Sequence, residues 1–159
     1  MIYIKIILDI GFGLGRDLRY IQSLKAECYG VDACQSFVDE LSKDESFKER
    51  LFCAKLPILG LDLGVKFGVV CCIAVIMHLT QEEIRTWVED LKNYLAVGGK
   101  VIVSYSLTPR EDDERFFEDL QEGVVSKIFL ESGFRLVDEV YSANVLGHGI
   151  DWVSGVYRL

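Results

Sequence analysis

Apolar runs and amphipathic segments alternate along the chain. Between the runs, apolar residues at helical spacing predict helices at Arg16–Leu24 and at Ser36–Leu41, the latter continuing through Asp44–Arg50. The runs themselves have the β-branched composition of buried strands: Ile2–Ile10, Cys28–Val31, Leu51–Ala54, Phe67–Ile76 and Lys100–Ser104. We interpret this as five strand–helix units, an order that predicts a parallel sheet covered on both faces.

The segment after the fourth predicted strand has a clear helix start. Thr80 and Glu83 have the spacing of a capping box, in which each side chain hydrogen-bonds the backbone of the other residue. The pair Gly98-Gly99 is expected to end this helix. One apolar stripe marks the face that should pack on the sheet: Ile84, Trp87, Val88, Leu91 and Leu95.

The last third of the chain predicts one more helix and two strands. The helix is expected at Phe116–Ser132, with Gly133 at its C-terminal cap. Phe134–Tyr141 and Asp151–Tyr157 alternate in polarity and are joined by a loop with two glycines, which is typical of antiparallel strands. The predicted fold class is α/β: a Rossmann-like, doubly wound sheet of seven mostly parallel strands, the last one antiparallel.

Composition narrows the class of protein. The chain has 159 residues and is 50% hydrophobic, which suits one globular domain spanning residues 1–159. The net charge is -8 and no basic cluster occurs, so nucleic acid is not favoured as a partner. No apolar run reaches the roughly 20 residues of a membrane span, so no membrane partner is expected.

The cysteines and histidines do not have the spacing of metal ligands. The five cysteines form no CxxC pair and the two histidines lack ligand spacing, so no metal site is expected. Met1 leads directly into an apolar strand without a signal-peptide pattern. A reducing, cytoplasmic location is therefore expected, with the cysteines acting as small buried apolar side chains.

A glycine-rich turn follows the first predicted strand. Gly11, Gly13 and Gly15 alternate there, which lets the backbone turn tightly and approach a ligand at the start of the next helix. Asp32 ends the second strand, where a carboxylate can accept hydrogen bonds from ribose hydroxyls. Together they predict a nucleoside pocket; a tight turn with Asp32 as a helix cap is the alternative. Arg16 stands where a dinucleotide fingerprint needs glycine, and no Walker motif follows.

These motifs resemble those of the class I S-adenosylmethionine-dependent methyltransferases. The run from Leu8 to Leu18 is similar to their first motif, and Tyr29-Gly30-Val31-Asp32-Ala33 to their second. The fourth strand with its exit, Val70 to Leu79, and the segment from Leu95 to Val101 are also similar. The tail, Ser132-Gly133-Phe134 with Gly147 to Trp152, resembles a bacterial subgroup of small methyltransferases, so the resemblance covers essentially the whole chain.

The resemblance implies S-adenosylmethionine as cofactor and methyl transfer to a small-molecule acceptor. It also implies that Asp9 braces the glycine loop and that Asp32 binds the ribose. The acid that meets adenine in the family is missing after the third strand, so adenine would depend on backbone and apolar contacts there. The implied cofactor-binding residues are Asp9, Gly11, Phe12, Gly13, Gly15, Asp32, Ala33, Ala54, Lys55, Leu56, Cys72 and Ile73.

His78 is the candidate for a catalytic base. It is the titratable residue near the exit of the fourth strand whose ordinary pKa is closest to neutral. The alternative is that it only packs or caps at the helix entry before Thr80. An acceptor site after the fifth strand is a further hypothesis, with Tyr105, Ser106 and Arg110 as its candidates. A contact with the methionine part of the cofactor is a hypothesis for Asp17, and His148 is interpreted as a residue of a mobile loop.

Three rival functions stay open at this point. Family members carry helices before the first strand that cover the cofactor, whereas this chain starts at the strand itself. We therefore expect an uncapped core, closed by a second copy in a homo-oligomer, by the Ser104–Phe116 loop, or not at all. A degenerate cofactor-binding domain without methyltransferase activity is the main rival. An NAD-dependent oxidoreductase and methylation of RNA or protein are the others.

Overall fold

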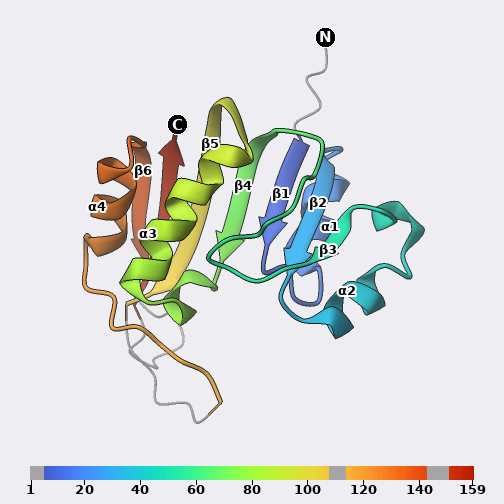
Figure 1. The fold of residues 1–159 in the computed structure, drawn as a ribbon, viewed down its shortest axis with the longest axis horizontal. Coiled ribbons are helices and arrows are strands. Elements are labelled where there is room, and N and C mark those ends of the chain that lie inside the picture. The colour runs from blue at the N-terminus through green and yellow to red at the C-terminus, as the bar shows by residue number, and fades with distance from the viewer. Residues whose placement is uncertain (1–5, 108–113, 143–150) are drawn as a thin grey trace.

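One mixed sheet with helices on both faces forms the molecule (Figure 1). The computed structural model describes residues 6–107, 114–142 and 151–159. The sheet order is β3-β2-β1-β4-β5-β7-β6. Its strands are β1 Ile6–Ile10, β2 Glu27–Asp32, β3 Leu51–Cys53, β4 Phe67–Ile73, β5 Leu95–Ser106, β6 Arg135–Ser142 and β7 Trp152–Arg158.

Strand direction confirms the predicted fold class. Strands β1 to β5 are all parallel to one another. The last strand of the chain, β7, runs antiparallel to both β5 and β6 and lies between them. The order reverses at β1, which lies between β2 and β4, and ligands of doubly wound sheets bind at such a switch point.

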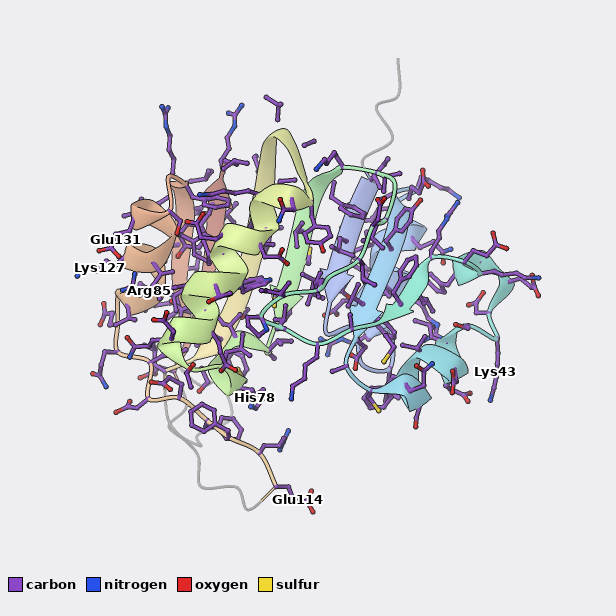
Figure 2. The ribbon with its side chains drawn as sticks, viewed as in Figure 1. Lys43, His78, Arg85, Glu114, Lys127 and Glu131 are labelled. Carbon is purple, nitrogen blue, oxygen red and sulfur yellow. The ribbon has the colours of Figure 1, made fainter. Side chains whose placement is uncertain are left out.

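Helices α3 and α4 cover one face of the sheet, and α1 lies behind β1 and β2 (Figure 1). Arg85 of α3 and Glu131 of α4 form an ion pair of 2.7 Å, and Figure 2 shows both side chains beside Lys127. The helices are α1 Arg16–Ser23, α2 Gln35–Leu41, α3 Gln81–Asp90 and α4 Val124–Glu131. Three short 3-10 turns join them: η1 Glu45–Phe47, η2 Ile76–His78 and η3 Leu91–Asn93.

Two hydrophobic cores of unequal size lie on the two faces. The larger core includes Trp87 of α3 and Phe129 of α4, and the ring of Phe129 stacks on Tyr157 with centroids 4.0 Å apart. The smaller core is built by α1, α2 and the strands beneath them: Phe12, Leu18, Cys28, Val38, Leu41 and Phe47. The alternation of buried and partly exposed residues along β4, β5 and β7 follows from the two-residue period of strands.

The predicted helix at Phe116–Ser132 is wrong in its first half. Helix α4 begins only at Val124, after Gly123, whose φ of 82° interrupts the helical backbone. Upstream of it, the backbone N–H of Glu118 donates to the carbonyl of Met77, so tertiary contacts occupy this segment instead of a helix. Gly133 does end α4, because the N–H of Phe134 returns to the carbonyl of Phe129.

Other predicted boundaries also shift. The capping box of Thr80 and Glu83 is present, but α3 ends at Asp90 and Gly98-Gly99 lies inside an irregularity of β5. The predicted continuation of α2 is instead the separate turn η1, capped by the side chain of Asp44. Residues 54–66 between β3 and β4 contain no helix, so the third strand–helix unit is incomplete, and β4 ends three residues before Ile76.

The cysteines are only partly as expected. All five are free, and Cys28 and Cys72 are buried. The expectation of burial is wrong for Cys34, which precedes α2, and for Cys53, which ends the edge strand β3; both are exposed. Within the described residues no cluster of three or more His, Cys, Asp or Glu side chains is placed to hold a metal ion. The described helices are too short or too polar to span a membrane.

Candidate active site

The glycine turn between β1 and α1 has left-handed backbone at each of its glycines. The φ angles are 78° at Gly11, 54° at Gly13 and 78° at Gly15, values that residues other than glycine rarely adopt. A Cβ on Gly11 would lie 2.3 Å from Cγ2 of Val75, so the turn also packs tightly against the exit of β4. A Cβ on Gly13 would meet no atom within 4 Å, which leaves open space above this residue.

Asp32 connects the glycine turn to the end of β2. Its Oδ2 accepts a hydrogen bond of 2.8 Å from the N–H of Gly13, and its Oδ1 accepts one of 2.8 Å from the N–H of Cys34. The residue is only 9% exposed. An ionised carboxylate has about four lone-pair positions, so each oxygen keeps one for a ligand hydroxyl. The carboxylate is therefore oriented by the backbone and still able to bind.

A cleft of about 490 Å³ opens beside these residues, beyond the carboxyl ends of β1, β2, β3 and β4. This is the switch point of the sheet. Its volume falls in the range of roughly 300–1,000 Å³ that is typical of small-molecule sites. Its lining is mostly apolar and consists of Ile10, Gly11, Gly13, Val31, Asp32, Ala33, Phe37, Ala54, Lys55, Leu56, Ala74, Val75, His78, Leu79 and Arg115.

Eight of the predicted site residues line this one cleft, although they come from four separate segments: Gly11, Gly13, Asp32, Ala33, Ala54, Lys55, Leu56 and His78. The other five are not among its lining residues. Phe12 and Cys72 are buried in the two cores, and Gly15 packs against Leu41 at the start of α1. Asp9 is buried within β1, and Ile73 is a partly exposed residue at the end of β4.

The environment of Asp9 makes its carboxyl group hard to ionise. Burial is the main cause, and the negative charges of Asp17 and Asp32 add to it; together they raise the pKa of Asp9 from 3.8 to about 7. The side-chain hydrogen bond that ties the glycine turn to the end of β2 is made by Asp32. Asp32 thus braces the loop, and the bracing role that the resemblance implied for Asp9 stays a prediction.

His78 lies in η2 and lines the cleft, below the sheet in Figure 2. Its Nδ1 is 2.8 Å from the carbonyl oxygen of Phe116, and its ring packs edge-on against Phe117 with centroids 4.5 Å apart. A carbonyl oxygen can only accept, so Nδ1 carries the hydrogen, and in neutral imidazole the lone pair is then on Nε2. The packing at the helix entry that the sequence left as the alternative is thus present, and His78 also lines the cleft; its role as a base stays a prediction.

The remaining candidates lie away from the cleft or outside the described residues. Tyr105 and Ser106 are buried, and burial, with Tyr157 nearby, raises the pKa of Tyr105 above its usual value. Asp17 pairs with Arg16 at 2.9 Å on the surface of α1. Arg110 and His148 lie outside the described residues.

Sequence reasoning missed seven lining residues: Ile10, Val31, Phe37, Ala74, Val75, Leu79 and Arg115. Most are apolar and carry no chemical signature. One physical sign is the backbone of Ala74, whose φ of 60° is left-handed for a residue with a side chain and is typical of functional sites. Arg115 comes from a distant segment, so only the fold brings it to the cleft.

Comparison with known proteins identifies the domain. A family model described as a methyltransferase domain matches residues 8–101, more than half of the chain. The chain belongs to this methyltransferase family. The class I resemblance seen in the motifs is thereby confirmed. Curated protein sequences contain no match to the chain.

Solved structures share the fold of this methyltransferase domain at low sequence identity. An S-adenosylmethionine-dependent methyltransferase from Clostridium acetobutylicum is 15% identical, with a TM-score of 0.75 over 98% of this chain and 84% of that one. The glycopeptide N-methyltransferase MtfA, complexed with S-adenosylmethionine, is 18% identical, with a TM-score of 0.75 over 96% and 80%. The [4+2]-cyclase SpnF is 14% identical, with a TM-score of 0.76 over 97% and 75%.

The cleft of the methyltransferase domain fits the methyl donor of class I enzymes, S-adenosylmethionine. The open space at the missing Cβ of Gly13 lets a ligand approach the backbone there. Asp32 beside it keeps lone pairs for the two hydroxyls of a ribose. The cleft has apolar walls at Phe37 and Leu56 for a flat base.

Proposed function

We propose that this domain binds S-adenosylmethionine in the cleft at the switch point and transfers its methyl group to a small-molecule acceptor. The observation that carries the proposal is the arrangement of Asp32 and Gly13. A carboxylate, oriented by two backbone N–H groups, borders open space at a glycine turn. The methyltransferase family assignment agrees with it.

Each part of the cleft has a role in this proposal. Asp32 accepts hydrogen bonds from the ribose, and the turn from Gly11 to Gly15 lies along the methionine part. Ala54 to Leu56 line the far side, where adenine contacts the backbone and apolar side chains. The exposed Lys55 stands among them, and a carboxylate for the adenine amino group is missing from these three residues.

The chemistry requires alignment and, for a protonated acceptor, a base. When bound, S-adenosylmethionine supplies a methyl group on a positively charged sulfur, a good leaving group. The walls of the cleft hold the acceptor in line with the carbon–sulfur bond, which breaks as the bond from acceptor to methyl forms. His78 takes the proton of the acceptor on Nε2, because its Nδ1 is held by Phe116.

A cofactor-binding domain without methyl transfer is the second candidate. Two observations favour it: the missing carboxylate after β3 and the position of Lys55 in its place. The fold alone does not decide between the two candidate functions, since one structural neighbour is named as a cyclase.

For the location of the protein in the cell we propose the reducing cytoplasm, which the five free cysteines support.

Calorimetric titration with S-adenosylhomocysteine, the demethylated product, tests the site. We expect binding by the wild-type protein and a loss of about tenfold to thirtyfold in Asp32→Asn, because one ligand acceptor is replaced by a donor. The matched control is Asp39→Asn, an exposed carboxylate on α2 that hydrogen-bonds Gln35 and should leave the affinity unchanged. Absence of binding at millimolar concentration rules out both candidate functions.

Methyl transfer is tested with S-adenosylmethionine labelled in its methyl group and a panel of small amines, phenols and thiols. Label in any acceptor supports the enzyme, and label retained on the donor despite tight binding supports the binding domain. In an active protein, His78→Gln should lower kcat and abolish its rise with pH, while the affinity for S-adenosylhomocysteine stays within about twofold. An unchanged pH profile would exclude His78 as the base.

A further inference from the structure

The cleft has two ends of different character. One end carries Gly13 and Asp32, the residues proposed to hold the methyl donor. The other end lies at the exit of β4, where His78 reaches the cleft from η2 and Arg115 from a segment that follows β5. Arg115 is a charged side chain at this second end to which methyl transfer itself assigns no role, so its contacts bear on the choice of acceptor.

The segment that carries Arg115 is tied to η2 at two points. Nδ1 of His78 donates to the carbonyl oxygen of Phe116, and the two atoms are 2.8 Å apart. The backbone N–H of Glu118 donates to the carbonyl of Met77, also at 2.8 Å. Because Arg115 directly precedes the first of these contacts, the fold holds it beside η2 at the cleft.

Arg115 and His78 pack against the same aromatic ring. Cζ of Arg115 lies 5.7 Å from the ring centroid of Phe117, within the range of a cation–π contact. The ring centroid of His78 lies 4.5 Å from that of Phe117. The guanidinium and the imidazole are therefore at most about 10 Å apart. An acceptor with one aromatic ring or a few carbons can contact both groups at once.

The charges of the lining favour an anionic acceptor. Among the described residues that line the cleft, Asp32 is the one acid, whereas Lys55 and Arg115 are cations. The sulfur of S-adenosylmethionine adds a further positive charge when the donor is bound. A protonated amine would then be repelled and a carboxylate attracted. This local excess of cations contrasts with the whole chain, whose net charge is -8.

The two cations of the cleft differ in their surroundings. Hydrogen bonds from Thr80 lower the pKa of Glu83, and the charge of Lys55 lowers it further, so Lys55 lies near the start of α3. Arg115 instead presents a planar guanidinium, whose parallel N–H groups match the two oxygens of a carboxylate. The contact with Phe117 keeps this plane oriented. Arg115 is therefore the better partner for an organic acid.

On the basis of the proposed methyl transfer, we propose that the acceptor is a small organic acid whose carboxylate binds to Arg115. A hydroxyl or thiol group elsewhere in the acid lies at Nε2 of His78 and gives its proton to this nitrogen. The methyl group passes from the sulfur to the oxygen or sulfur of that group, and S-adenosylhomocysteine is released. The carboxylate is unchanged, and Arg115 selects acids over neutral analogues.

Matched acids and amides test this selection in the full chain. The pairs are acetate and acetamide, benzoate and benzamide, and 4-hydroxybenzoate and 4-hydroxybenzamide. Each compound is titrated by calorimetry into the protein saturated with S-adenosylhomocysteine. At least one acid should bind at least tenfold more tightly than its amide, which cannot form the charge-assisted pair of hydrogen bonds. Added salt should weaken binding of that acid more than binding of its amide.

Substitution of Arg115 assigns the preference to one residue. In Arg115→Gln the acid and its amide should bind within about threefold of each other, and Arg115→Lys should retain part of the preference because it keeps the charge. The matched control is Arg135→Gln, an exposed arginine of β6 that does not line the cleft and should keep the wild-type preference. A merely structural role of Arg115 would weaken the acid and the amide alike, which would overturn the proposal.

The carboxylate of the donor is the alternative partner of Arg115. S-adenosylhomocysteine carries an amino-acid part, whereas 5′-methylthioadenosine lacks it. We expect Arg115→Gln to bind both compounds within about twofold of the wild type. A loss of at least tenfold for S-adenosylhomocysteine, with 5′-methylthioadenosine unchanged, would assign Arg115 to the donor and overturn the proposal.

Other results also contradict an acid as acceptor. These are equal binding of every acid and its amide, no binding of any acid at millimolar concentration, and tighter binding of phenyl phosphate than of benzoate, which would make the anion a phosphate. Binding of S-adenosylhomocysteine to the wild type is measured before any acid is added. Its absence contradicts the proposed function, whereas its presence with any of these results contradicts the acid acceptor alone.

Discussion

Asp9 is the described side chain whose protonation has the clearest link to stability. Its pKa is raised to about 7 in the folded protein, against an ordinary value of 3.8. Between these values the folded state binds more protons than the unfolded state. The contribution of protonated Asp9 to the free energy of unfolding is therefore fully present below about pH 4 and is lost as the pH rises through about 7.

Replacing Asp9 by Asn should remove this loss. The amide keeps the shape of the neutral carboxyl group, so the gain in free energy of unfolding over the wild type should grow by about 2–3 kcal/mol from pH 5 to pH 8. Urea unfolding at the two pH values measures it. The exposed Asp39→Asn serves as control and should show no such growth. A gain that is independent of pH would mean that Asp9 is ionised throughout.

Ala74 holds a left-handed backbone at the wall of the cleft. Its φ is 60°, and its N–H donates to the carbonyl of Ser104 at 2.7 Å, which keeps the strand exit in this conformation. Ala74→Gly should raise the free energy of unfolding by about 0.5–1 kcal/mol, because the relieved strain exceeds the added chain entropy. Ala54→Gly, at a cleft residue without positive φ, should instead lower it. Chemical denaturation of both variants gives the comparison, and a loss at Ala74 would refute strain there.

The residues of the cleft divide by how they could be predicted. Asp32 and the glycines stand in local motifs whose chemistry is visible in a few consecutive letters, and the fold brings Gly11, Gly13 and Asp32 to one place. Val75 and Phe37 have no such signature, since an apolar wall residue looks like any core residue in sequence. Arg115 lies about a hundred residues after the glycine turn in the sequence, and no local pattern predicts that the two meet at one cleft.

At the scale of elements, the start of α3 is the best-defined local signal. Thr80 accepts from the N–H of Glu83, and Glu83 returns to the backbone of Thr80. Thr80→Ala should lower the free energy of unfolding by about 1 kcal/mol, because the N–H of Glu83 at the helix start loses its acceptor. Thr86→Ala, whose hydroxyl donates to Glu82 within the helix, should be nearly neutral. If thermal unfolding showed the same loss of stability in Thr80→Ala and Thr86→Ala, the cap would not stabilise the helix.

Elements could be predicted where their cause is local. The capping box and the alternation of β7 are properties of a few neighbouring residues, and both are confirmed. The segment from Phe116 to Leu120 has apolar residues at helical spacing, yet its carbonyl and N–H groups bind His78 and Met77. These partners are about 40 positions away in sequence, so tertiary contacts decided against a helix.

The whole molecule combines a large core with a small one. The larger core joins α3 and α4 to the sheet, whereas α1 and α2 rest on a few side chains such as Phe12, Leu18 and Phe47. Buried apolar contact sets the free energy of local opening. The α1–α2 layer should therefore open at a lower free energy than α3 and β4.

Hydrogen exchange of backbone amides tests this difference and its link to the cleft. Under native conditions the amides of α1 and α2 should exchange faster than those of β4, since their layer opens without global unfolding. The cleft takes Gly13 and Phe37 from the α1–α2 side and Leu79 from the other, so a ligand there connects both. Saturating S-adenosylhomocysteine should slow exchange in α1 and α2 at least tenfold, and more than in α4. Equal slowing across the sheet, or protection confined to α4, would contradict a cleft shared between the two cores.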